Sequence, residues 1–115
     1  MNDGLPPPPV DVDPDIADLI PVFYANRVAD VDRARACLAA GDLDGVRRIG
    51  HGMKGSGASY GFAMMTELGA ALEDAAKNGD VGGCGAIVDE VARTLGVLRV
   101  VDGGVEHALS EYDPR

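Results

Sequence analysis

Residues 45–60 surround one histidine, His51, with cations and glycines. The stretch holds three cations and no acid, although the whole chain carries a formal net charge of -9. It also holds five of the 16 glycines. An imidazole among cations, with little side-chain bulk around it, suits a site that receives a bulky anion, and a phosphoryl group on the ring is the sharpest candidate. The cations are Arg47, Arg48 and Lys54, and the glycines are Gly45, Gly50, Gly52, Gly55 and Gly57.

Helical periodicity places His51 on the solvent side of its helix. Val46, Ile49, Met53 and Gly57 form one apolar stripe, and His51 lies about 150° from the middle of that stripe. The residues three or four positions from His51 are Arg47, Arg48, Lys54 and Gly55. Three of these four are cationic, and the fourth has no side chain.

The residues after His51 suggest how such a site would work. Each glycine inside a helix costs about 0.8–1 kcal/mol relative to alanine, which indicates positions where a side chain would obstruct. Gly55 is therefore predicted to leave the imidazole open. Lys54 would place an ammonium beside phosphoryl oxygens, and Ser56 would bond back to the preceding turn or donate toward the site. The plainer interpretation, an inert surface histidine on a solvated basic face, stays open at this point.

The whole chain is predicted to fold as an all-α, up-and-down antiparallel four-helix bundle with a short extra N-terminal helix. No convincing period-2 alternation appears anywhere, and the turns between helices have two to four residues. Asp13, Asp42 and Asp80 are predicted helix caps. The predicted helices cover residues 15–20, a longer segment to about 40, then 43–59, 62–78 and 80–103.

Three parts are expected along the chain. Residues 1–12 are predicted to be a disordered proline-rich lead, because they contain too little apolar surface to pack. Residues 13–104 form the bundle, and residues 105–115 are a tail of uncertain structure.

Composition excludes several classes of function. A chain of 115 residues is one domain by length. Cys37 and Cys84 lack the paired spacing of a disulfide framework or zinc site and are expected in or beside the core. A pI near 4.4 argues against duplex binding. The first residues resemble no signal peptide and no apolar run could cross a bilayer, so we expect a cytoplasmic monomer that binds neither nucleic acid nor membrane.

Residues 47–62 resemble the signature of histidine-containing phosphotransfer (HPt) domains. They read Arg-Arg-Ile-Gly-His-Gly-Met-Lys-Gly-Ser-Gly-Ala-Ser-Tyr-Gly-Phe, with Lys-Gly-Ser beginning three residues after the histidine, a run of small residues, and a glycine opening the next helix. Residues 20–27, 38–42 and 68–80 are also similar to the family's helices. The resemblance covers roughly residues 15–102.

The resemblance implies roles for individual residues. His51 would accept the phosphoryl group on its outer ring nitrogen, Lys54 would help to neutralise it, and Gly55 would give clearance. The next helix would contribute Glu73 and Lys77. Lys77 ranks above Glu73, because a glutamate beside a phosphoryl group is unfavourable unless it bonds to the ring N–H. As an i,i+4 pair, the two residues are equally well explained as helix stabilisation.

The resemblance also implies the partners. Family members exchange a phosphoryl group with the aspartate of response-regulator receiver domains, supplied by a histidine kinase or hybrid kinase. The motif region has no carboxylate cluster for a metal, so no cofactor of its own is expected, and Mg²⁺ would come from the receiver. Arg47, Arg48 and Ala58 are the expected partner contacts. The chain would be a phosphocarrier and not an enzyme with turnover.

Rival functions fit the sequence less well. An ATP-dependent histidine kinase would need a glycine-rich nucleotide-binding segment and a longer chain. A metal protein is disfavoured because His51 and His107 lack helical ligand spacing. A helical adaptor that binds signalling partners without being phosphorylated remains the alternative.

Overall fold

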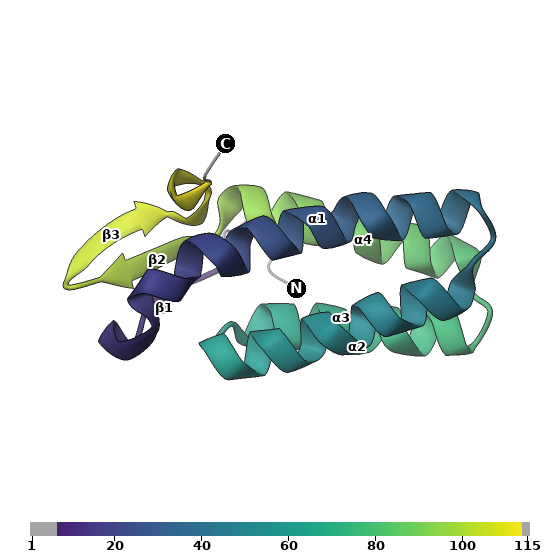
Figure 1. The fold of residues 1–115 in the computed structure, drawn as a ribbon, viewed down its shortest axis with the longest axis horizontal. Helices are drawn as coiled ribbons and strands as arrows, with labels where there is room; N and C mark the ends of the chain where they lie inside the picture. The colour runs from purple at the N-terminus through teal and green to yellow at the C-terminus, as the bar shows by residue number, and fades with distance from the viewer. Residues whose placement is uncertain (1–6, 114–115) are drawn as a thin grey trace.

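An antiparallel bundle of four helices forms the main body of the computed structural model, which describes residues 7–113 (Figure 1). Each helix contacts the next, and the last contacts the first. The predicted all-α bundle is therefore confirmed. The helices are α1 (Ile20–Ala39), α2 (Leu43–Tyr60), α3 (Ala63–Lys77) and α4 (Val81–Val97).

Aspartate side chains begin two of these helices. Asp42 accepts a hydrogen bond from the backbone N–H of Gly45 at 2.9 Å, and Asp80 accepts one from Gly83 at 2.9 Å. Each carboxylate satisfies a backbone donor that has no partner within its helix. Gly61 ends α2 with a φ of 80°, a conformation that favours glycine. These turns let α2 lie antiparallel to both neighbours.

The predicted short N-terminal helix is a 3₁₀ helix, η1 (Pro14–Leu19), which leads directly into α1. Asp13 caps it by accepting a hydrogen bond from the N–H of Asp15 at 2.9 Å. Proline at the first helical position fits this start, because its missing N–H would have had no helical partner.

A small sheet closes one end of the bundle and corrects the helix predicted over residues 80–103, whose last residues form a strand. Helix α4 ends at Val97, and residues beyond it form the hairpin β2 (Arg99–Asp102) and β3 (Val105–Ala108), followed by the 3₁₀ helix η2 (Leu109–Tyr112). Strand β1 (Val10–Asp11) pairs in parallel with β2. These strands have two to four residues, too few to show a period of two.

The predicted disordered lead is wrong for residues 10–12. Val10 pairs with Val100, and Val12 is buried against the core. Residues 1–6 lie outside the described residues. Residues 10–12 are held by the sheet, because β2 offers them a backbone edge and an apolar face.

The core runs through all four helices and reaches the sheet. Phe23 of α1 stacks on Phe62, with ring centroids 4.6 Å apart. Cys84 is buried and Cys37 is half-buried, so both occupy the predicted core or boundary positions. In α2 the buried stripe contains Gly50, whereas the predicted Ile49 is only half-buried.

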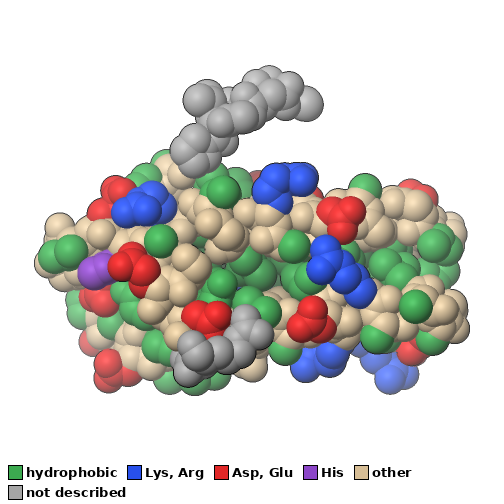
Figure 2. Space-filling view, turned by 90° about the horizontal axis from the view of Figure 1, so that it is seen from above, with side chains coloured by type: hydrophobic (Ala, Val, Ile, Leu, Met, Phe, Trp, Pro, Cys, Tyr) green, Lys and Arg blue, Asp and Glu red, His purple; other side chains and the backbone are tan. Residues whose placement is uncertain are grey.

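Charge is mixed over the outer face of α1 and α4. Figure 2 shows acidic and basic side chains interspersed there among apolar ones. Among residues 7–113, no helix has the length and apolar character needed to cross a membrane.

Candidate functional site

Helices α2 and α3 lie side by side (Figure 1) and touch nearly backbone to backbone through glycines. A Cβ added to Gly50 would stand 2.7 Å from the backbone nitrogen of Glu73, and one added to Gly69 would stand 2.4 Å from that of Lys54. Real Cβ atoms essentially never approach other atoms so closely. The glycines therefore let the backbones of α2 and α3 lie so close together that side chains of α3 can contact those of α2.

Glu73 of α3 uses this close approach to contact three basic side chains. Its Oε1 lies 2.8 Å from Nζ of Lys54, and its Oε2 lies 3.1 Å from Nδ1 of His51. Nζ of Lys77 is 3.9 Å from Oε2. The Glu73 side chain is only 8% exposed, whereas His51 is 68% exposed. A buried carboxylate thus holds one edge of a solvent-exposed imidazole ring.

The charge state of Glu73 follows from its partners. The hydrogen bond from Lys54 holds the pKa of Glu73 below its ordinary value, opposed by burial, which raises it. The bond with His51 and the charges of Lys54 and Lys77 lower that pKa further. Glu73 is therefore a carboxylate at neutral pH and can only accept hydrogen bonds.

A carboxylate at Nδ1 selects one tautomer of the neutral histidine. The hydrogen bond requires the proton on Nδ1, which leaves the lone pair on Nε2, at the far side of the ring. His51 thus presents a free nucleophilic nitrogen on the exposed surface of α2. Glu73 thus meets the condition predicted for it, a bond to the ring N–H. Lys77 contacts the carboxylate of Glu73 and, within residues 7–113, makes no hydrogen bond to the ring.

The predicted basic patch is partly neutralised. One guanidinium nitrogen each of Arg47 and Arg48 lies 2.9 Å from an oxygen of Asp44, and the hydrogen bond from Arg47 lowers the pKa of Asp44. Asp44 was missed at the level of sequence because it precedes the acid-free stretch. Its i,i+3 and i,i+4 spacing to the two arginines was the available signal.

Ser56 does not reach the His51 ring. Its Oγ accepts a hydrogen bond from Arg27 of α1 and donates one to the carbonyl of Met53 at 3.2 Å. Arg27 in turn pairs with the buried Asp30 at 2.7 Å. Of the two predicted roles, the bond back to the preceding turn is therefore confirmed. In place of a bond toward the ring, Ser56 contacts Arg27 of α1.

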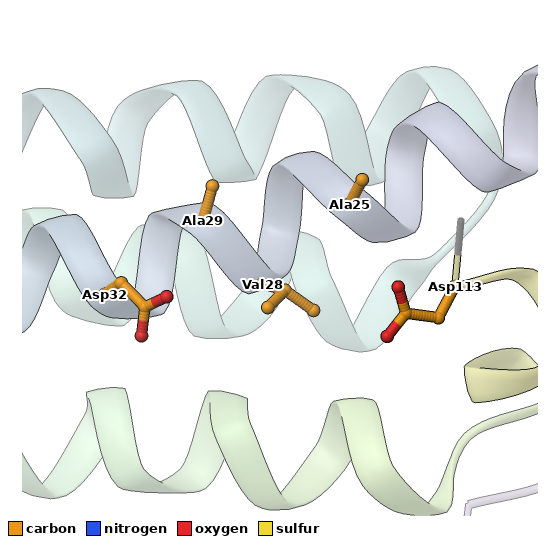
Figure 3. A pocket seen from close by; sticks show the side chains of 5 residues that line it. All are labelled: Ala25, Val28, Ala29, Asp32 and Asp113. Carbon is orange, nitrogen blue, oxygen red and sulfur yellow. The ribbon is translucent and has the colours of Figure 1, made fainter. Parts of the chain in front are cut away.

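Other parts of the molecule offer less to a reacting group. A hollow of about 180 Å³ lies beside α1. Figure 3 shows the carboxylates of Asp32 and Asp113 on either side of Val28 there. His107 belongs to the hairpin, where its Nδ1 is 4.0 Å from Glu111. Within residues 7–113, no three His, Cys, Asp or Glu side chains group as a metal site would require.

Replacing Gly69 with alanine is expected to destabilise the protein by about 1–3 kcal/mol, because the added methyl group meets the backbone of α2 and overpacks the contact. Urea unfolding measures the change. Gly85→Ala is the matched control, since nothing lies within 4 Å of a Cβ at Gly85 of α4. Equal stability of the Gly69 variant and wild type would show that the helices separate without cost.

Gly55 is expected to behave in the opposite way. Nothing lies within 4 Å of a Cβ at this position, so Gly55→Ala should stabilise α2 by up to about 1 kcal/mol. Gly55→Gln should obstruct the approach to His51 and slow the phosphoryl transfer that the sequence predicts there, while the fold remains intact. Thermal melts and transfer rates of both variants test this, and a lowered melting temperature in both would contradict it.

The sequence of the bundle and the hairpin matches a known protein family. A sequence model described as the Hpt domain matches residues 18–108, nearly the whole of the bundle and the hairpin. No curated protein and no solved structure matches the chain.

Proposed function

The chain belongs to the Hpt domain family, and from this premise we propose that it carries a phosphoryl group on Nε2 of His51 between receiver domains. Membership of the family implies a role in two-component phosphotransfer. One observation supports the assignment to His51: its Nδ1 lies 3.1 Å from the buried carboxylate of Glu73, which leaves Nε2 as the exposed nucleophile.

The donor in this proposal is an aspartyl phosphate on a receiver domain. The Nε2 lone pair attacks phosphorus in line with the departing oxygen. The N–P bond forms, the P–O bond to the aspartyl carboxyl breaks, and the carboxylate leaves with the electron pair. Nδ1 keeps its proton, so the ring becomes a phosphorylated imidazolium whose positive charge faces Glu73. In the reverse step, a receiver carboxylate attacks phosphorus and the N–P electrons return to Nε2.

Charge around the phosphoryl group comes from both proteins. Lys54 lies beside the ring with Glu73 as its partner, and its ammonium can share its protons with phosphoryl oxygens. Mg²⁺ held by the receiver's own carboxylates would neutralise the remaining charge. Arg47 and Arg48 lie one turn before His51 and attract the receiver's acidic pocket. The chain itself acts as a cytoplasmic carrier without turnover, loaded through a histidine kinase or hybrid kinase.

A transfer assay tests the proposal directly. Incubation with a phosphorylated receiver and Mg²⁺ should label this protein with an acid-labile phosphoryl group, and incubation with ATP alone should not. Stable binding of receivers without any label would instead support the alternative of a non-phosphorylated adaptor. Labelling by ATP alone would contradict the carrier role.

Replacing Lys54 with alanine is expected to slow transfer by about fivefold, because an exposed ionic contact contributes about 1 kcal/mol. The effect should be smaller than loss of His51, since the nucleophile remains. Initial rates at limiting receiver measure it, and Arg93→Ala, which removes an exposed cation from α4, is the control. Unchanged rates for the Lys54 variant would make Lys54 ordinary helix surface.

A further inference from the structure

A hollow of about 330 Å³ lies where α2 turns into α3. Nearly all of its lining is small or apolar, and the one ionisable group is the carboxylate of Glu67. The volume suits a single apolar side chain of a partner. The lining residues are Gly57, Ala58, Gly61, Ala63, Thr66 and Glu67.

This hollow is continuous with the surface around His51. Ala58 follows His51 by two helical turns, about 10 Å along α2 and about 20° around it. Gly55 lies between them on the same face, and a Cβ there would meet nothing within 4 Å. An unobstructed strip therefore leads from the reactive ring to the hollow.

Glu67 differs in its contacts from Glu73 and Asp44. Glu73 and Asp44 are paired with cations, whereas Glu67 is exposed and makes no ion pair or hydrogen bond with any residue in 7–113. It also borders a second hollow, of about 410 Å³, against residues 7–11. Its carboxylate is thus available to a partner at the junction of two hollows.

We infer that the hollow receives an apolar side chain of the docking receiver, and that Glu67 favours receivers with a lysine or arginine beside that side chain. This inference rests on the proposed function. The face is charged in two places. Around His51 the cations Arg47, Arg48, Lys54 and Lys77 outnumber their partner carboxylates Asp44 and Glu73, and Glu67 lies at the other end of the strip. A partner with an acidic pocket and a cation at the matching separation can dock in one orientation only, because the reverse orientation opposes like charges.

The test measures phosphoryl transfer from a panel of purified phosphorylated receivers, at limiting concentration, to three variants. Glu67→Lys reverses the rim charge, Ala58→Gln fills the hollow, and Asp32→Lys reverses an exposed carboxylate on α1 as the control. Labelling of every variant with phosphoramidate, a small phosphoryl donor that needs no docking surface, reports the reactivity of His51 alone.

Glu67→Lys is expected to slow transfer from the fastest receivers by about tenfold, with a smaller loss at high salt. Ala58→Gln should slow it too, and Asp32→Lys should not. Changing the cation of a receiver's docking surface to glutamate should restore transfer to Glu67→Lys. Phosphoramidate labelling should be equal throughout. Wild-type transfer rates in both Glu67→Lys and Ala58→Gln would overturn the docking inference while leaving the carrier function intact. Failure of receivers to label wild-type His51 would overturn the carrier function, and the docking inference with it.

Discussion

Replacing His51 with glutamine is expected to abolish acid-labile labelling by a phosphorylated receiver without changing the helical circular dichroism. The amide nitrogen of glutamine has no available lone pair to attack phosphorus, so the loss should be complete. The fold should persist, because His51 is 68% exposed and glutamine is the better helix former.

His107→Gln is the matched control and should label as wild type does. His107 lies in β3, where its neighbours are Glu111 and Tyr112. Label that remains in the His51 variant would show that another residue carries the phosphoryl group.

The helices and their turns could be predicted because the signals for them are local. The period of apolar residues locates each helix, and Asp42 and Asp80 mark starts through bonds to residues three positions later. The outward direction of His51 follows from the same period. Such features depend on neighbours within one turn, which a single sequence displays.

The sheet could not be predicted in the same way. Val10 pairs with Val100, and nothing in either short segment indicates a partner so distant in the chain. The pairing depends on the bundle, which brings the two segments together. Strands of this length show no pattern of their own.

Only part of the candidate site could be predicted, because only part of it depends on residues that are close together in the sequence. His51, Lys54 and Gly55 lie within two turns of one helix, so their proximity could be inferred. The central place of Glu73 could not, because its burial depends on the close approach of α2 and α3 at Gly50 and Gly69. Along α3 alone, Glu73 and Lys77 form an ordinary i,i+4 pair.

Glu73→Gln is expected to slow transfer by about 10- to 100-fold, by analogy with the loss of a carboxylate that orients a metal-ligating histidine. The carboxylate of Glu73 accepts two hydrogen bonds, one from Nζ of Lys54 and one from the N–H at Nδ1 of His51. An amide offers one acceptor and one donor, so it cannot satisfy both. If its oxygen accepts from Lys54, its NH₂ faces Nδ1, which favours the proton on Nε2 and blocks the nucleophile.

The free energy of unfolding should also change with this substitution, and the lowered pKa of Glu73 determines whether it rises or falls. A carboxylate whose pKa is lower in the folded state stabilises the fold above its unfolded pKa, and this stabilisation is lost as the pH falls through the folded pKa. Glu73→Gln should therefore destabilise the protein at neutral pH and flatten the acid side of its stability profile. Urea unfolding between acid and neutral pH measures both effects.

Combining Glu73→Gln with Lys54→Ala tests whether Glu73 acts by orienting the His51 ring or only by supporting the structure of α3. In a Lys54→Ala background the competing donor is gone, so the amide oxygen introduced by Glu73→Gln is free to accept from Nδ1 and restore the reactive tautomer. The loss of transfer caused by Glu73→Gln should then be smaller than in the presence of Lys54, which is a non-additive result of the kind that contacting residues produce. Initial transfer rates for the wild type, both single variants and the double variant measure the coupling. Purely additive losses would mean that Glu73 supports α3 without selecting the tautomer of His51.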